Sequence, residues 1–133
     1  MSDCIFCKIV KGEIPSYKVY EDKEFLGFLD ISQIVDGHTL LIPKKHVRWI
    51  WDIENIGGFY KVAKKIVKKM QEVSGKKFVM SVTWGTMVEH AHLHLLPTTA
   101  GNRDIIGKAW IKARETRKLS DEKMKVIQKK FQG

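Results

Sequence analysis

The sequence of 133 residues has only two cysteines and no long hydrophobic run. No apolar stretch approaches the roughly 20 residues that span a bilayer. The chain does not open with a basic segment followed by an apolar one, so no secretory signal is visible. These absences predict an intracellular, cytoplasmic protein without a membrane segment. The length fits one domain with one core, and we find no internal repeat or low-complexity segment.

Positive charge is concentrated in the last quarter of the chain. The net charge is +9; residues 103–133 carry 10 Lys and Arg against 4 Asp and Glu, whereas residues 1–102 carry 14 against 11. We therefore expect a domain over 1–101 and a basic extension over 102–133, packed on the domain or on a dimer. The excess favours anionic partners such as nucleotides, nucleic acid or acidic proteins. A solvated helix that only aids solubility is the alternative.

The spacing of apolar residues predicts a mixed fold. Strands are indicated over 18–21, 25–29, 39–43, 78–83 and 90–96, and helices over 4–11, 56–74 and 121–130. Asp3 is the expected N-cap of the first helix and Ser120 that of the last. The order is neither alternating βαβ nor all-β, so the sequence predicts the α+β class with an antiparallel sheet.

Two of the predicted helices have faces that need an explanation. The helix over 56–74 carries a row of lysines opposite its apolar face, which is either a phosphate-binding patch or simply its solvated side. The last helix has a narrow apolar stripe that must be covered by the domain or by a second subunit; it consists of Met124, Ile127 and Phe131.

Three histidines alternate with apolar residues in the segment His90-Ala91-His92-Leu93-His94. On a strand, successive side chains point to opposite faces, so all three imidazoles are expected on one face. Histidine is the side chain that is both nucleophilic and able to shuttle protons near neutral pH. The row therefore indicates catalysis. Three surface histidines or three metal ligands are the alternatives.

Cys4 and Cys7 form an isolated Cys-x-x-Cys pair. A disulfide is not expected in a reducing compartment. A thioredoxin-type redox pair needs a preceding strand, and only three residues precede Cys4. A zinc half-site that requires two further ligands is the favoured interpretation, and two buried thiols are the alternative.

Several segments in this order resemble the histidine triad (HIT) superfamily, in particular its Hint-like branch. The similarity runs from about residue 3 to residue 97 and rests on His90–Leu96 together with Cys4–Ile9, Gly12–Pro15, Phe28–Ser32 and Gly37–His46. The resemblance implies a HIT fold: a five-stranded antiparallel sheet with one long and one short helix. In this chain a basic extension with a further helix follows. It also implies a homodimer.

The resemblance further implies the site and its chemistry. Position for position, a structural zinc ion is held by Cys4, Cys7, His46 and His90. His92 is the nucleophile that attacks the α-phosphorus of a nucleotide, and His94 donates to a phosphate oxygen, while His38 orients the site from behind. Asp30 accepts from the ribose hydroxyls, and Ile31 contacts the base. The implied activity is hydrolysis of purine nucleoside phosphoramidates or related nucleotides through a nucleotidyl-histidine intermediate.

The sequence departs from the Hint-like pattern near the phosphate. Thr86 and Met87 stand where that branch has Gln and Ser, and Gln33 replaces an expected Pro. Met87 cannot donate a hydrogen bond, so Thr86 is the expected substitute. Two alternative functions stay open: removal of AMP from nucleic-acid ends, as in aprataxin, and nucleotide binding with little catalysis. Nucleic acid, contacted through the basic extension, is the less favoured partner. Within that extension, Trp110 and its basic neighbours are expected either to select substrate or to pack the extension on the dimer.

Overall fold

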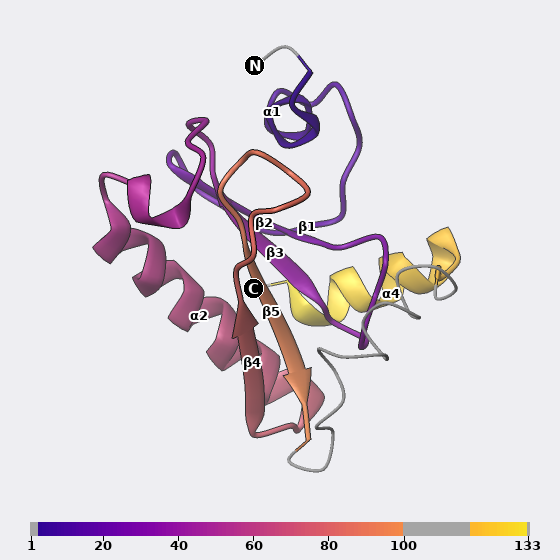
Figure 1. The fold of residues 1–133 in the computed structure, drawn as a ribbon. Coiled ribbons are helices and arrows are strands. Elements are labelled where there is room, and N and C mark those ends of the chain that lie inside the picture. The colour runs from indigo at the N-terminus through magenta and orange to yellow at the C-terminus, as the bar shows by residue number, and fades with distance from the viewer. Residues whose placement is uncertain (1–2, 100–117, 133) are drawn as a thin grey trace.

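The computed structural model describes residues 3–99 and 118–132, so the predictions for Trp110 and its neighbours lie outside the described residues. Figure 1 shows a single sheet with helices on both of its faces. Its five strands lie in the order β1-β2-β3-β5-β4, and every neighbouring pair is antiparallel. They are β1 (Lys18–Glu21), β2 (Phe25–Leu29), β3 (Thr39–Pro43), β4 (Phe78–Val82) and β5 (Leu93–Thr98). The predicted α+β class and five-stranded antiparallel sheet are confirmed.

Three α-helices and one 3₁₀ turn accompany the sheet in the described parts of the chain: α1 (Ile5–Val10), η1 (Ile50–Asp52), α2 (Ile56–Ser74) and α4 (Asp121–Phe131). The turn η1 was not predicted. Ser120 caps α4 as expected, because its side chain accepts from the Lys123 N–H. The predicted cap of α1 is wrong: Cys4 takes that position instead of Asp3, with extended backbone and its sulfur accepting from the Cys7 N–H. None of the described helices is long and apolar enough to cross a membrane.

The sheet separates two apolar clusters. On one face, α2 and α4 pack against side chains that include Leu41, Leu93 and Leu95. On the other, Phe6 and Ile9 of α1 pack against a smaller cluster that includes Leu40. Alternation along β3 and β5 therefore decides which side chains face α2 and which face α1. The functional site lies on the α1 side.

The predicted strand over 90–96 begins later than expected, at Leu93. The β3–β5 register pairs Leu41 with Leu93, which would place Pro43 opposite Ala91 two residues further along. Proline has no N–H, so the ladder cannot continue through that position. The Pro43 carbonyl instead accepts from the ring of His90 at 2.7 Å. Only His94 of the three histidines is therefore in regular strand.

The apolar stripe of α4 is covered by the domain itself. Met124, Ile127 and Phe131 are buried in the cluster shared with α2. The Phe131 ring lies against Gly37, whose φ of +98° is in the left-handed region; a Cβ there would lie 2.5 Å from the Phe131 Cζ atom. Gly37 directly precedes His38, so α4 supports the turn that leads into the site.

We expect Gly37→Ala to destabilise the fold by about 2–4 kcal/mol, because a methyl group would combine a strained φ with overlap against a buried ring. Gly57→Ala is the matched control: nothing lies within 4 Å of a Cβ at Gly57, which is in α2. That control is expected to be neutral or to stabilise by up to about 1 kcal/mol. Urea unfolding of both variants measures the difference, and equal midpoints would contradict the proposed packing.

Candidate active site and metal centre

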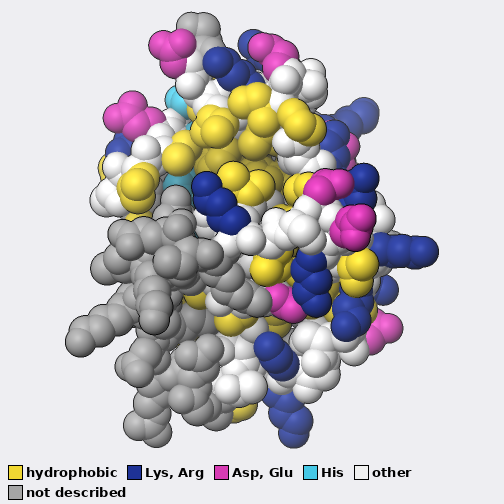
Figure 2. Space-filling view, turned by 90° about the vertical axis from the view of Figure 1, so that its right-hand side faces the viewer, with side chains coloured by type: hydrophobic (Ala, Val, Ile, Leu, Met, Phe, Trp, Pro, Cys, Tyr) yellow, Lys and Arg dark blue, Asp and Glu magenta, His cyan; other side chains and the backbone are white. Residues whose placement is uncertain are grey.

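A pocket of about 260 Å³ opens between α1, the ends of β2 and β3, and the loop before β5. Its walls are mostly apolar, and its polar lining residues are Ser16, Asp30, Thr86, His92 and His94. No Lys or Arg is among the described residues that line it. In Figure 2, hydrophobic side chains gather at the upper end of the molecule, where α1 lies in Figure 1, with histidine at their edge. Such a mainly apolar pocket with a few convergent polar groups is typical of a small-molecule site.

The protonation of His92 can be derived from its hydrogen bond. Its Nδ1 atom lies 2.7 Å from the His90 carbonyl oxygen. A carbonyl oxygen only accepts, so Nδ1 carries the proton of the neutral ring and Nε2 carries the lone pair. Phe6 also packs edge-on against the His92 ring, with the two ring centroids 5.3 Å apart, and so restricts the orientation of that ring. His92 thus presents the protonation state that a nucleophile needs.

A chain of hydrogen bonds sets the protonation of His94. The Ile34 N–H donates to His38 Nδ1 at 3.3 Å, so the proton of His38 is on Nε2. That atom lies 2.9 Å from His94 Nδ1, which must accept. The proton of neutral His94 is then on Nε2, the nitrogen suited to donate to a bound anion. The Asp30 carboxylate lies beside both rings, 3.6 Å from His38 Nε2.

Gln33 braces the turn that carries Asp30 and His38. Its buried amide donates to the carbonyl oxygens of both residues, at 2.5 and 2.8 Å, and its oxygen accepts from the Gly37 N–H. The Ser32 N–H donates to Asp30 Oδ1 at 2.8 Å, which orients that carboxylate. In the sequence, Gln33 stands only as a departure from an expected Pro. A buried amide with three backbone partners explains how the turn keeps its shape without it.

The loop from Trp84 to Val88 forms one wall of the pocket. Arg48 holds it by donating to the Gly85 carbonyl oxygen at 2.5 Å, while the same guanidinium lies 4.1 Å from the centroid of the Trp49 ring. Gly85 has φ +67°, and a Cβ there would lie 2.7 Å from Trp49. Met87 is 79% exposed at the pocket mouth. Arg48 and Trp84 were missed from the sequence, because nothing in their spacing links them to the histidines.

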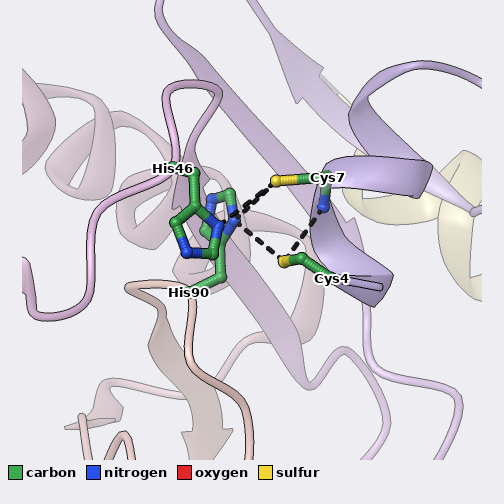
Figure 3. Close-up of side chains that lie close together, drawn as sticks. All are labelled: Cys4, Cys7, His46 and His90. Carbon is green, nitrogen blue, oxygen red and sulfur yellow. Dashed lines mark hydrogen bonds between the residues drawn. The ribbon is translucent and has the colours of Figure 1, made fainter. Parts of the chain in front are cut away.

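Four side chains converge at the N-terminal end of α1 (Figure 3). The ligand atoms of Cys4, Cys7, His46 and His90 all lie within 4.8 Å of one another. His90 Nδ1 lies 3.4 Å from the Cys4 sulfur and 3.5 Å from the Cys7 sulfur, and His46 Nδ1 lies 3.3 Å from the Cys7 sulfur. These are the four residues predicted as a ligand set.

The cluster has the dimensions of a tetrahedral metal site. Bond lengths of about 2.3 Å to sulfur and 2.0 Å to nitrogen place sulfur and nitrogen ligands about 3.5 Å apart, which agrees with the observed spacing. His90 donates from Nε2 to the Pro43 carbonyl, so its Nδ1 lone pair points at the sulfurs, as a ligand requires. Burial lowers the pKa of His90 and keeps the ring neutral. Burial and the adjacent Cys4 raise the pKa of the Cys7 thiol, an effect that a bound cation reverses.

The short helix α1 links the metal cluster to the pocket. Phe6 contacts both His90 and His92, with centroids 5.8 and 5.3 Å away, and lies between the two cysteines in the sequence. Ile5, Phe6 and Ile9 line the pocket. A helix of six residues is too short to be stable by itself. The position of α1 therefore depends on these contacts and on any metal ion held by its two cysteines.

The fold, the histidine pocket and the Cys/His cluster together define a histidine triad protein. The family model of the HIT domain matches residues 11–101 of the sequence. The chain belongs to the HIT family. It is similar to Protein hit of Bacillus subtilis, with 38% identity over 121 residues that cover 81% of this chain and 79% of that protein. It is 37% identical over 107 residues to adenosine 5′-monophosphoramidase HNT1 of Candida albicans, covering 72% of this chain and 70% of that protein.

Two solved structures extend the likeness to nearly the whole chain. A hypothetical histidine triad nucleotide-binding protein from Sulfolobus tokodaii has a TM-score of 0.82 at 29% identity, covering 97% of this chain and 89% of that one. A zinc-bound histidine triad family protein from Mycobacterium smegmatis has a TM-score of 0.75 at 28% identity, covering 98% and 94%. These likenesses agree with the predicted HIT fold of the described residues.

The predicted site residues fall into two groups in space. Asp30, Ile31, Thr86, His92 and His94 line one pocket, with His38 buried behind His94. The four predicted ligands form a separate cluster beside it. The structure differs from the predicted strand over 90–96 in that His90 and His92 precede β5 instead of lying in it. Their side chains stay on the α1 side because Ala91, Leu93 and Leu95 alternate into the opposite core.

Proposed function

We propose that this protein hydrolyses purine nucleoside phosphoramidates or related nucleotides at the α-phosphate. The observation that carries the proposal is the Nε2 lone pair of His92, set by the bond from Nδ1 to the His90 carbonyl, in a pocket that also holds Asp30 and His94. The adenosine 5′-monophosphoramidase of Candida albicans supports this substrate class. The absence of Lys and Arg from the described lining favours a leaving group without a polyphosphate chain.

The proposed reaction has two steps at His92. Nε2 attacks the α-phosphorus, a nitrogen–phosphorus bond to the imidazole forms, and the bond to the amine breaks as the amine takes a proton from solvent. Water then attacks the same phosphorus, the imidazole is released with its neutral ring restored, and the nucleoside monophosphate leaves. Dividing the substitution in this way replaces one difficult step by two easier ones.

Three neighbours assist in this proposal. His94 donates from Nε2 to a phosphate oxygen and stabilises charge as it develops, and His38 keeps His94 in the required tautomer. Asp30 accepts from the ribose hydroxyls, with Ile31 against the base. Thr86 is the proposed second donor to the phosphate, since Met87 cannot donate. Bound metal, proposed to be zinc, is a closed structural cross-link between α1 and the loops that carry His46 and His90.

The direct test is incubation of the purified protein with adenosine 5′-phosphoramidate and detection of AMP. Turnover supports the proposed hydrolase. Tight binding of AMP without turnover would instead favour the alternative of a nucleotide-binding protein with little catalysis, for which the exposed Met87 is the supporting observation. A cytoplasmic location stays a prediction from the sequence.

We also propose a homodimer that pairs β4 edges beside the long helix. Among the described strands, β4 lies at an edge of the sheet and pairs only with β5, and an open edge strand is a template for pairing with another chain. Phe78 on that strand is 52% exposed.

Phe78→Glu is expected to shift the protein toward monomers, because it places a charge on the proposed contact. Val126→Glu on α4, at 61% exposure, is the matched control and is expected to leave the assembly unchanged. Sedimentation equilibrium measures both, and a wild-type monomer at micromolar concentration would overturn the proposal.

A further inference from the structure

Five lysines of α2 line a groove of about 750 Å³ on the side of the sheet opposite the histidine pocket: Lys61, Lys64, Lys65, Lys68 and Lys69. We call this the α2 lysine groove. Its other walls come from β1 and from the end of α4. Because α2 packs on the cluster that includes Leu93 and Leu95, the groove and the pocket lie on different faces of the molecule. The groove is therefore independent of the proposed hydrolytic site.

The charge of this groove is not balanced within the described part of the chain. None of the five lysines forms an ion pair there. Glu72 is the only acidic residue in α2. Glu21 also lines the groove, but its carboxylate already pairs with Lys18 at 3.0 Å and with Lys44 at 2.8 Å. A surface that only aids solubility usually mixes both signs.

This arrangement opposes the stability of the helix. Lys61 and Lys65, Lys64 and Lys68, and Lys65 and Lys69 are each four residues apart, a spacing at which like charges on a helix repel. A bound anion removes that repulsion. The unpaired row thus indicates an occupant with several negative charges at regular intervals, since Lys61 to Lys69 spans about 12 Å of helix.

We propose that the α2 lysine groove binds single-stranded nucleic acid through its phosphates. Ammonium groups recognise phosphate as point charges. Among the described lining residues there is no Arg or Asn, and the one side-chain amide, that of Gln132, already donates to the Lys18 carbonyl oxygen, so binding is expected to be independent of sequence. A basic groove that follows the backbone beside an aromatic ring is typical of single-strand binding. Here the ring is Tyr20, with the Lys65 ammonium 5.9 Å from its centroid.

The test measures binding of a fluorescein-labelled 20-nucleotide oligo(dT) by anisotropy between 50 and 200 mM salt. Five phosphate contacts on a single strand predict a slope of log K against log salt of about −3.5. Lys64→Gln with Lys65→Gln and Lys68→Gln is expected to make the slope shallower by about 2 and to weaken binding at least roughly 10-fold. The matched control changes three exposed lysines outside the groove, Lys11, Lys77 and Lys118, to Gln, and it is expected to bind as the wild type does.

Two further readouts separate this proposal from a solvated face. The melting temperature of the groove variant is expected to equal or exceed that of the wild type, because repulsion is relieved, and its hydrolytic activity is expected to be unchanged. If the triple variant does not fold, Lys68→Gln alone is expected to change the slope by about 0.7. Equal weakening by the control, no weakening by the groove variant, or equally strong binding of a polyglutamate of the same length would each overturn the proposal.

Discussion

Replacing His92 by alanine is expected to lower the turnover number for adenosine 5′-phosphoramidate by roughly 10³-fold or more, because the attacking nitrogen is removed and direct attack by water must replace two easier steps. Binding of AMP is expected to change little, since Asp30 and the apolar walls remain in place. Turnover is measured by AMP release, and binding by calorimetry. Acid quenching of the wild-type reaction with labelled substrate is expected to trap a nucleotidyl adduct that the variant lacks.

His38→Ala is the informative comparison, because His38 touches His94 and not the pocket. It is expected to lower the turnover number less than His92→Ala does, since the attacking nitrogen remains while His94 loses the partner that sets its proton position and the Ile34 N–H loses its acceptor. Activity of His92→Ala within tenfold of the wild type would remove His92 from the role of nucleophile. In that case the hydrogen-bond chain through His38 would need a different explanation.

The double substitution Cys4→Ser with Cys7→Ser is expected to remove the bound metal and to lower the melting temperature by about 10 °C or more. A structural zinc site contributes on the order of 10 kcal/mol of apparent binding energy, and even the loss of about 3 kcal/mol corresponds to a shift of this size in a domain of this length. Metal analysis of wild-type protein purified without chelators is expected to find about one zinc ion per chain. The turnover number is expected to fall less than the stability does.

A chelator applied to the wild type provides the matched comparison, because it removes the metal and keeps both thiols. Its effect on the melting temperature is expected to approach that of the double variant and to be reversed by added zinc. Acid is expected to act in the same direction, since protons compete with metal for the thiolates and for the lone pairs of His46 and His90. Wild-type protein with no bound metal would count against the ligand set.

The sequence predicted most of the fold, because apolar periodicity is strong in this chain. The strands over 18–21, 25–29 and 39–43 and the helix from Ile56 match the structure. The late start of β5 could not be predicted from alternation alone. It depends on the register with β3, which brings Pro43 opposite Ala91, and register is a property of the assembled sheet. The cap of α1 was missed because a cysteine sulfur, a weak acceptor, replaces the usual Asp.

The candidate site was predictable to the extent that its residues belong to recognisable motifs. Asp30, His38, His46 and the three histidines were named from the sequence. The structure places them in or directly behind one pocket and in one cluster able to hold a metal ion. Residues that act through contacts with the backbone were not predictable. Gln33 donates to the carbonyl oxygen of Asp30 within its own turn, and Arg48 donates to that of Gly85, which is distant in the sequence. Hydrogen bonds from a side chain to the backbone leave no periodic pattern in the sequence.

The position of α1 has a consequence for how the protein responds to metal supply. The short helix that carries Cys7 and is capped by Cys4 also provides Ile5, Phe6 and Ile9 to the wall of the pocket. Without the proposed metal, His92 would keep its hydrogen bond to the His90 carbonyl oxygen, but this wall would lose the proposed cross-link. If the proposed metal and hydrolase activity hold, removal of the metal is expected to raise the KM for nucleotide more than it lowers kcat, which kinetics of chelator-treated protein would measure.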